Sequence, residues 1–589
     1  MMHVPGMYKR MVMVLALLVS AVGPVWALEL PPEVLSEMAR VAEHSNQAIE
    51  RSLEAPDNSR AAKAFEIQKA LDEAESALRA VPVEKSLPRI TEAGPAFFVR
   101  KVQVPSCQLL SDEVLASLVK PFEGRDQTMQ SMQDLADRIT LEYRKRGYFS
   151  SQAYIPPQEM QDGVFTVAVL EGRIGRITFE GNVHYSTAVL LRYCDIKEGD
   201  FFSYQKLQQT VSKLNAHPDR IVRAIIRRGQ VPGETDIVFK VEEQSLASGS
   251  VIADNHSSKP IGQNRAGMGY RRDNVLGQDD ILRMGAMGGK DFGSGFVEHA
   301  LPIAGINSVW KTGVGFSKSS PQKQYKPYGI STTTMDYWGR LESRLITDET
   351  LALDWKTGLD IRESRTKFMS GTDSRDRLRI LRFGPALTLQ DGWGGTMMEN
   401  QFSLGLDGLG AAVYSASSQR TDVQPDFFAS DFSVQRMQKM PLHTRLSLQG
   451  KAHLSPDKQP SSEQMALGGA DSVRGYPEED YFADQGLVVN AEYLIPFFFL
   501  PDAWKMPRTK DRLSDRLDLA LFLDEGWGWL KDPAEGQRGS RTLSGTGVGV
   551  RARLMNDIYF TTDFAWAVGE RPEQSDHRFR IHSGLQANF

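Results

Sequence analysis

An arginine in a glycine-rich segment and a carboxylate further along the chain are the residues best suited to a shared chemical task. Arg474 lies in Leu467–Tyr476, which reads LGGADSVRGY, and Asp524 lies in Phe522–Gly526, which reads FLDEG. An arginine and a carboxylate can form two parallel hydrogen bonds, which fix orientation as well as strength. Gly475 permits a tight turn beside the arginine. The two segments therefore predict a buried ion pair inside a polar cavity.

The carboxylate of Asp524 belongs to a stretch with strict two-residue alternation. Its apolar positions are Leu517, Leu519, Leu521 and Leu523. Since successive side chains of a strand point to opposite faces, Asp518, Phe522 and Asp524 share the other face. A loop that brings Arg474 into a confined space needs such a partner, because an unpaired charge there is costly. The strand is therefore expected to form part of the cavity wall.

The same alternation recurs from Ser248 to the C-terminal Phe589. Stretches at 351–362, 445–454, 547–554 and 578–589 place apolar residues on one face and polar, mostly charged residues on the other. Helical patterns are missing there, and the stretches have about the ten residues of a transmembrane β-strand. A closed barrel satisfies every backbone hydrogen bond in lipid, which an open sheet cannot do. We therefore expect a membrane β-barrel of about sixteen antiparallel strands over residues 244–589, with water inside.

Aromatic residues near the expected strand ends fit the interfacial girdle of such a barrel. They are Trp310, Tyr337, Trp338, Trp527, Trp529 and Trp566. Each of them could also be simply a large side chain that faces lipid.

The N-terminus and the composition indicate an exported protein. A basic pair, an apolar run that ends before Pro24 and small residues up to Ala27 have the order of a secretory signal peptide, which gives residues 1–27. The net charge is −5 over 589 residues, and the basic residues are spread along the chain, which argues against nucleic acid as a partner. Two cysteines, Cys107 and Cys194, exclude a disulfide-rich fold, and a bond between the two stays open.

Two similar units precede the expected barrel. Each has the order strand, two helices, two strands, over residues 97–173 and 174–243. Such self-similarity indicates a repeated α+β module. Residues 28–96 have helical spacing in two stretches, followed by a linker punctuated by prolines. The expected order is a signal peptide, a helical segment, two modules and a barrel.

This order, together with Val473-Arg474-Gly475-Tyr476 and Phe522-x-Asp524-x-Gly526, resembles the outer-membrane transporters of two-partner secretion, the haemolysin-activator and filamentous-haemagglutinin transporter family. The resemblance implies that the modules are periplasmic polypeptide-transport-associated (POTRA) domains and that residues 28–96 hold the plug helix and its linker. This segment is longer than one pore-filling helix needs, so a loose periplasmic helical hairpin stays open as an alternative, as does which helix would plug the pore. It also implies that the first motif lies at the tip of a loop folded into the barrel, with Arg474 paired to Asp524 of the inner wall.

On this resemblance the protein recognises an unfolded partner exoprotein in the periplasm and translocates it through the outer membrane to the cell surface. It is expected to be a monomer in outer-membrane lipid, without nucleic acid, metal or other cofactor. The POTRA strand edges could accept an extended client by strand addition. The alternative is that they only space the barrel from other parts of the envelope.

Other functions stay open at this point. A barrel-assembly or insertion factor shares the superfamily fold but usually carries more POTRA modules. A porin would need no modules, and an enzyme would need a nucleophile–base pair that the sequence does not display. The segment Gly285–Asp291 resembles a phosphate-binding loop, but no helix is expected after it. The histidines lack the spacing of metal ligands. The sequence therefore favours a transporter over an enzyme.

Overall fold

The computed structural model describes residues 94–589 except 216–218, 304–306, 348–349, 368–372, 415–422, 502, 506–511, 534–536, 556 and 574. The expected signal peptide (1–27) and residues 28–93 of the expected helical segment lie outside the described residues. The chain divides into two compact units. One contains Ser248–Arg271 and Leu282–Phe589, and the other contains the described residues up to Ala247 together with Arg272–Ile281. No helix of the described ranges is long and apolar enough to cross a membrane.

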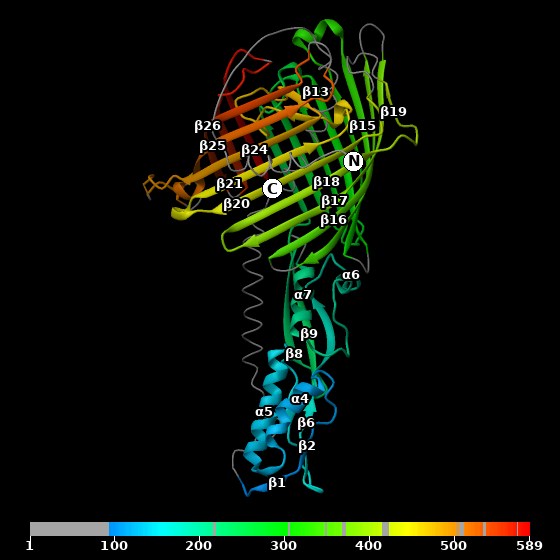
Figure 1. Ribbon diagram of the computed structural model, residues 1–589, viewed down its shortest axis with the longest axis vertical. Coiled ribbons are helices and arrows are strands. Elements are labelled where there is room, and N and C mark those ends of the chain that lie inside the picture. Colours follow the sequence, from blue (N-terminus) through cyan, green and yellow to red (C-terminus); the bar gives the residue numbers. More distant parts are fainter. Residues whose placement is uncertain are drawn as a thin grey trace, which may run out of the picture. The chain divides into compact units, whose positions relative to one another are not determined.

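The first module packs two helices on pairs of short strands, drawn in blue and cyan in Figure 1. Its elements are β1 (Phe97–Val99), β2 (Lys101–Gln103), α4 (Asp112–Val119), β3 (Arg125–Gln127), α5 (Met129–Lys145), β4 (Gln152–Tyr154), β5 (Val164–Thr166) and β6 (Ala168–Leu170). Strand β1 pairs with β3, β2 with β5 and β4 with β6. Helix α5 begins with a reciprocal cap, because the side chains of Thr128 and Ser131 each accept the other's backbone N–H.

The second module is a three-stranded sheet covered by two helices. Its elements are β7 (Arg173–Glu180), α6 (Thr187–Leu191), α7 (Tyr204–Leu214), β8 (Arg220–Arg228) and β9 (Glu234–Glu243). The sheet order is β7-β9-β8, with β9 parallel to β7 and antiparallel to β8. Because β9 is central, its Ile237 and Phe239 are fully buried and pack with Leu214 of α7.

The two cysteines lie in the cores of different modules and are both free. The Cys107 sulfur lies 2.9 Å from the hydroxyl oxygen of Tyr143. Burial, with a contribution from Asp195, raises the pKa of the Cys194 thiol to about 12. Since the thiolate is the reactive form, Cys194 is a poor nucleophile at neutral pH. The disulfide that the sequence left open is not formed.

Within the described part of the chain, sixteen antiparallel strands close into a barrel, with the last strand paired to the first. They are β10 (Ala247–Asp254), β11 (Arg265–Asp273), β12 (Ile281–Gly289), β13 (Phe292–Ile303), β14 (Ser308–Ser319), β15 (Ser331–Thr347), β16 (Leu351–Lys367), β17 (Asp373–Asp391), β18 (Gly394–Gly405), β20 (Phe428–Lys439), β21 (Arg445–Leu454), β24 (Gln485–Pro496), β25 (Leu517–Trp529), β26 (Ser540–Met555), β27 (Ile558–Ala567) and β28 (Phe579–Asn588). The short β19 (Ala412–Tyr414) adds to β17. The fold expected from the alternating pattern is confirmed.

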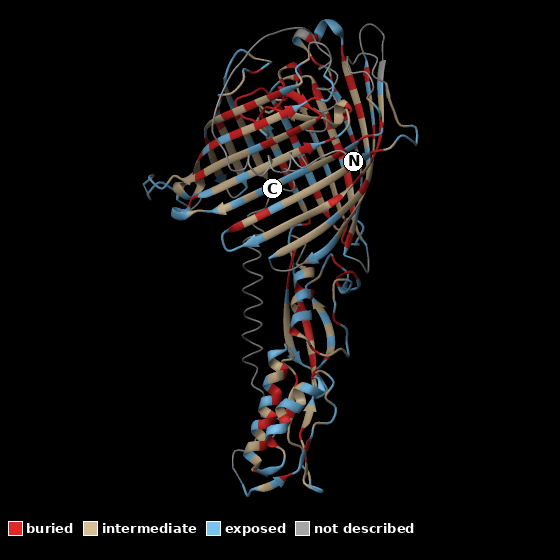
Figure 2. Cartoon of the chain, viewed as in Figure 1, coloured by how far each residue is buried: buried red, intermediate tan, exposed pale blue. Residues whose placement is uncertain are grey.

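Burial alternates along several barrel strands, clearly on β11, β13 and β25, and Figure 2 colours the strands by burial. On β25, Phe522 and Asp524 are buried while Leu521 and Leu523 are exposed. This is the division into an inner polar face and an outer apolar face that the sequence pattern predicts.

The expected aromatic girdle needs one correction. Trp310, Tyr337, Trp529 and Trp566 are exposed. Trp338 instead points to the inner face, where its Nε1 donates a hydrogen bond of 2.9 Å to Oε2 of the buried Glu298. Tyr337 and Trp338 are consecutive on β15, so they cannot both face lipid.

Candidate functional site in the barrel lumen

The segment between β21 and β24, residues 455–484, folds back against the inner face of the barrel and is called the lumenal loop here. It contains the 3-10 turn η5 (Ser461–Glu463) and a short hairpin of β22 (Met465–Leu467) and β23 (Tyr481–Ala483). Val473 and Tyr476, near its tip, are fully buried. They share a core with Leu543 of β26 and Ala567 of β27. The tip therefore packs directly on the barrel wall.

Glycines make room for this close approach. A Cβ atom on Gly526 would lie 2.7 Å from Cγ2 of Val473, and one on Gly545 would lie 2.0 Å from the carbonyl oxygen of Arg474. Gly475 has a φ of 93°, in the left-handed region that favours glycine. The last residue of the Phe522-x-Asp524-x-Gly526 motif is thus explained by the space that the loop occupies.

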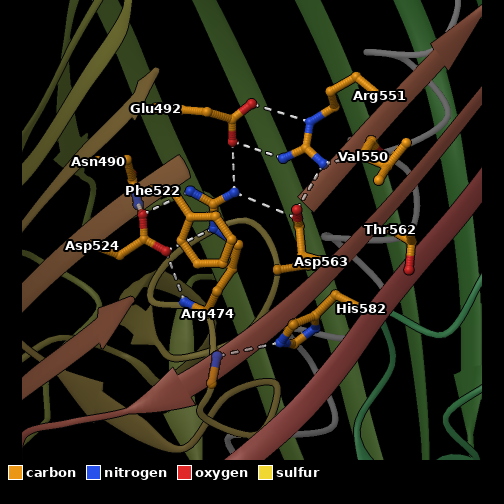
Figure 3. A network of polar contacts seen from close by, with 12 residues as sticks. Arg474, Asn490, Glu492, Phe522, Asp524, Val550, Arg551, Thr562, Asp563 and His582 are labelled. Carbon is orange, nitrogen blue, oxygen red and sulfur yellow. Dashed lines mark hydrogen bonds and ion pairs between the residues drawn. The ribbon is translucent and has the colours of Figure 1, made fainter. Parts of the chain in front are cut away.

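Arg474 and Asp524 are in direct contact (Figure 3). Nε of Arg474 donates to Oδ2 of Asp524 at 2.7 Å, and Nη2 donates to Oδ1 at 2.9 Å. The backbone N–H of Arg474 also donates to Oδ2, at 3.1 Å. The guanidinium carbon lies 3.5 Å from the ring centroid of Phe522, a cation–π arrangement. Asp524 is fully buried and Arg474 is 6% exposed, so the pair is shielded from water.

Three further strands extend the pair into a network. Nη1 of Arg474 lies 2.7 Å from Oε2 of Glu492 on β24 and 3.4 Å from Oδ2 of Asp563 on β27. Arg551 on β26 joins the same two carboxylates, at 2.7 Å from Glu492 and 2.6 Å from Asp563. Asn490 on β24 donates to Oδ1 of Asp524 and to the Ser472 carbonyl oxygen. Figure 3 shows these side chains converging on the guanidinium.

The remaining residues of the first motif also touch the wall. The Tyr476 hydroxyl donates to the Glu570 carbonyl oxygen at 2.8 Å and accepts the Ser544 backbone N–H at 3.3 Å. The Gly475 backbone N–H donates to Nε2 of His582 on β28 at 3.4 Å. The structure therefore brings Val473, Arg474, Gly475 and Tyr476 together with Phe522, Asp524 and Gly526 at one place.

The neighbouring charges at the tip of the loop keep Arg474 and Glu478 ionised despite their burial. Burial disfavours the charged guanidinium of Arg474, but the hydrogen bonds and charge of Asp524 outweigh it and raise the pKa of Arg474 above its ordinary value. Burial also disfavours the carboxylate of Glu478 on the same loop, but His582 holds its pKa below the usual range. Arg474 and Arg551 face the three carboxylates of Asp524, Glu492 and Asp563 in this network. The wall therefore holds the positively charged side chain of Arg474.

Sequence reasoning missed Asn490, Glu492, Arg551 and Asp563. Asn490 is the register partner of Asp524, and Glu492 is the register partner of Phe522, on the neighbouring strand. Arg551 was visible on the charged face of its strand, but its partners were not. The signal that could have found them is a polar residue at an inward position of β24, β26 or β27, the strands nearest to β25 in this part of the barrel.

Residues 233–552 match the family model "Haemolysin secretion/activation protein ShlB/FhaC/HecB". Residues 97–172 match "POTRA domain, ShlB-type", and residues 172–244 match the POTRA model "Surface antigen variable number repeat". The first range runs from the start of β9 into β26 of the barrel, and the other two ranges cover the first and the second module.

Relatives and a solved structure agree with these matches. The chain is 23% identical over 405 residues to the outer membrane transporter CdiB of Dickeya dadantii (strain 3937), which covers 67% of this chain and 71% of the relative. It is 22% identical over 424 residues to the heme/hemopexin transporter protein HuxB of Haemophilus influenzae (strain ATCC 51907 / DSM 11121 / KW20 / Rd), covering 68% and 72%. The structure of CdiB from Escherichia coli has the same fold, with a TM-score of 0.63 at 20% identity over 90% of this chain and 99% of that chain.

The family match spans more than half of the chain and follows two POTRA matches. The chain therefore belongs to the haemolysin secretion/activation family ShlB/FhaC/HecB and is an outer-membrane transporter of the two-partner secretion type.

Proposed function

We propose that this protein moves its unfolded partner exoprotein through the barrel lumen and that the lumenal loop must leave its docked position for the client to pass. One observation carries this proposal. A folded loop is held against the inner wall by the network of Arg474, Asp524, Glu492 and Asp563. A polypeptide that crosses the lumen and a docked loop compete for the same space, so the network has to open during transport.

The two modules are proposed to receive the client first. In the β7-β9-β8 sheet, β7 and β8 are the outer strands. An outer strand offers free backbone N–H and C=O groups, to which an extended chain can add as a further strand. We assign residues 97–173 and 174–243 to the modules and 244–589 to the barrel in this scheme.

Transport is proposed to proceed without catalysis or a cofactor, in a monomer surrounded by outer-membrane lipid. The periplasm supplies no nucleotide, so the driving force would come from folding of the client outside the cell. The ion pairs of the lumen then act by being made and broken, and they carry out no bond chemistry.

Replacement of Arg474 by alanine tests the proposal. Arg474→Ala leaves Asp524 buried without its cation, which costs about 3–5 kcal/mol in comparable buried pairs. Because transport needs these ion pairs to be re-formed as well as broken, a loop that cannot dock again should stall transport. We therefore expect secretion of the partner exoprotein to fall at least tenfold, while the barrel still inserts, as judged by its heat-dependent gel mobility. Arg445→Ala is the matched control, since Arg445 pairs with Asp518 outside the network and is partly exposed. Normal secretion by Arg474→Ala would reject the mechanism.

Deletion of the gene addresses the alternative of a barrel-assembly factor. A two-partner transporter should deprive the medium of one exoprotein and leave other outer-membrane proteins at their normal abundance. A general fall in outer-membrane proteins would identify an assembly factor instead. Quantitative proteomics of medium and envelope measures both.

A further inference from the structure

The lumenal loop makes a second buried ionic contact, at its stem. Glu463 ends the turn η5, just before β22. Its Oε1 lies 2.9 Å from Nη1 of Arg362 on β16, and its Oε2 lies 3.0 Å from Nη2 of Arg382 on β17. The three side chains are between 7% and 9% exposed. The carboxylate is therefore clamped between arginines of two adjacent strands, shielded from water.

The two arginines are held in position by the wall itself. Nε of Arg362 donates to Oδ1 of Asp336 on β15 at 2.6 Å. Nε of Arg382 donates to Oδ2 of Asp360 at 2.7 Å, and its Nη1 donates to the Ser403 hydroxyl at 2.7 Å. With these atoms fixed, each guanidinium presents its remaining N–H groups to the loop. Arg362 and Arg382 therefore form a pre-organised binding site for the Glu463 carboxylate, which is called the seat.

The docked loop adds a carboxylate to a group of ion pairs on the barrel wall. Arg340 also pairs with Asp360, at 3.1 Å. Arg340, Arg362 and Arg382 thus face Asp336 and Asp360 from the wall, and Glu463 supplies the third carboxylate. A neutral residue at position 463 would take a buried carboxylate away from Arg362 and Arg382, which is more costly than loss of a surface pair.

The seat lies on a different part of the wall from the tip network. In the barrel order, β18, β20 and β21 separate β17 from β24. Neighbouring strands are about 4.8 Å apart, so the two wall regions are roughly 19 Å apart along the sheet. The loop is consequently tied to two separate parts of the barrel wall.

We propose that Glu463 is a second anchor of the lumenal loop, which holds the stem to Arg362 and Arg382 independently of Arg474. We call Glu463 with its two arginines the stem anchor, and Arg474 with Asp524, Glu492 and Asp563 the tip anchor. The lumenal loop is then held to the barrel wall at its stem and at its tip. The inference rests on the proposed function for its consequence in transport, namely that both anchors must open before the lumen is clear.

Hydrogen–deuterium exchange of the full-length protein in lipid nanodiscs tests the stem anchor without any client. In Glu463→Gln, backbone amides in peptides covering 459–467 should exchange at least about tenfold faster, because the contacts to both arginines lose their charge assistance. Peptides covering 472–477 should keep their wild-type rates. In Arg474→Ala, the peptides covering 472–477 should exchange faster and those covering 459–467 should keep their wild-type rates. Ser462→Ala is the matched control, because it keeps the backbone and the Glu463 side chain.

Unchanged exchange at 459–467 in Glu463→Gln would overturn the proposal, as would equal acceleration of the stem and tip peptides. If Glu463→Gln does not yield a folded barrel, Glu463→Asp replaces it. That variant keeps the charge but shortens its reach, and it should accelerate the stem peptides alone to a smaller degree; equal rates to wild type would again overturn the anchor. The proposed function is judged separately, by secretion from Arg474→Ala, so the two can fail independently.

Discussion

The two ends of the lumenal loop are held by charges of opposite sign. At the tip a cation, Arg474, meets three carboxylates of the wall, two of which also pair with Arg551, and at the stem an anion, Glu463, meets two arginines of the wall. A loop inserted in the opposite sense would bring like charges together at both places. The opposite charges can therefore determine which end of the loop docks on which part of the wall, in addition to stabilising the docked loop.

The two anchors also differ in their surroundings. The tip combines its ion pairs with apolar packing, since Val473 and Tyr476 are fully buried and Phe522 lies under the guanidinium. The stem contacts are polar, with Asp336 and Ser403 as the neighbours that orient the arginines. The tip should therefore be the stronger anchor, and the variants below test that order.

Charge reversal at the tip should have the largest effect. Arg474→Glu adds a fourth carboxylate beside Asp524, Glu492 and Asp563, so tip docking should lose more than the roughly 3–5 kcal/mol of a broken buried pair. Glu463→Lys should cost less, because the stem contacts lack the apolar packing that the tip has around Val473 and Tyr476. Hydrogen–deuterium exchange rates of the tip and stem peptides give the loss of docking free energy in each variant. A stem reversal that costs more than the tip reversal would contradict this order.

A change of shape at the tip should have an intermediate effect. Gly526→Val places a side chain where Val473 packs, and such overpacking typically costs about 1–3 kcal/mol. Exchange should accelerate in peptides covering 472–477 and stay constant at the stem. The control is Gly293→Ala on β13, where an added Cβ would meet no atom within 4 Å. If both variants behave alike, close packing at Gly526 does not contribute to docking.

Coupling between the anchors should be the smallest effect. Sites that lie more than about 7–10 Å apart and share no partners usually combine within about 0.5 kcal/mol. The free energies lost in Arg474→Ala and Glu463→Gln should therefore add in the double variant, as measured by exchange under the same conditions. A coupling of 1 kcal/mol or more, on the order seen for residues in one network, would mean that the loop responds as one rigid body.

The barrel and the central pair of the tip could be predicted from the sequence because both depend on local pattern. Alternation along one strand places Asp524 inside, and the glycines beside Arg474 indicate a turn. Glu492, Arg551 and Asp563 could not be assigned, because their contacts depend on the register between strands. The same alternation rule, applied to consecutive residues, would have excluded Trp338 from the lipid face.

Glu463 escaped prediction for another reason. The segment Ser461–Glu463 has no periodicity and reads as an ordinary polar turn. Its partners Arg362 and Arg382 are distant in sequence and lie beside other inward charges of the wall, such as Asp336 and Asp360. The path of the lumenal loop in the structure is needed to show that the Glu463 carboxylate pairs with Arg362 and Arg382.

A reversible cross-link between loop and wall tests the central claim most directly. Val473 and Gly526 approach closely enough for a disulfide, since a Cβ on Gly526 would lie 2.7 Å from Cγ2 of Val473. The double variant V473C/G526C should form this bond on oxidation, as checked by gel mobility, and the single variants serve as controls. We expect secretion of the exoprotein to fall at least about tenfold relative to the reduced double variant, and reductant to restore it, because a pinned tip cannot clear the lumen. Undiminished secretion by the fully oxidised protein would contradict the requirement that the loop undock.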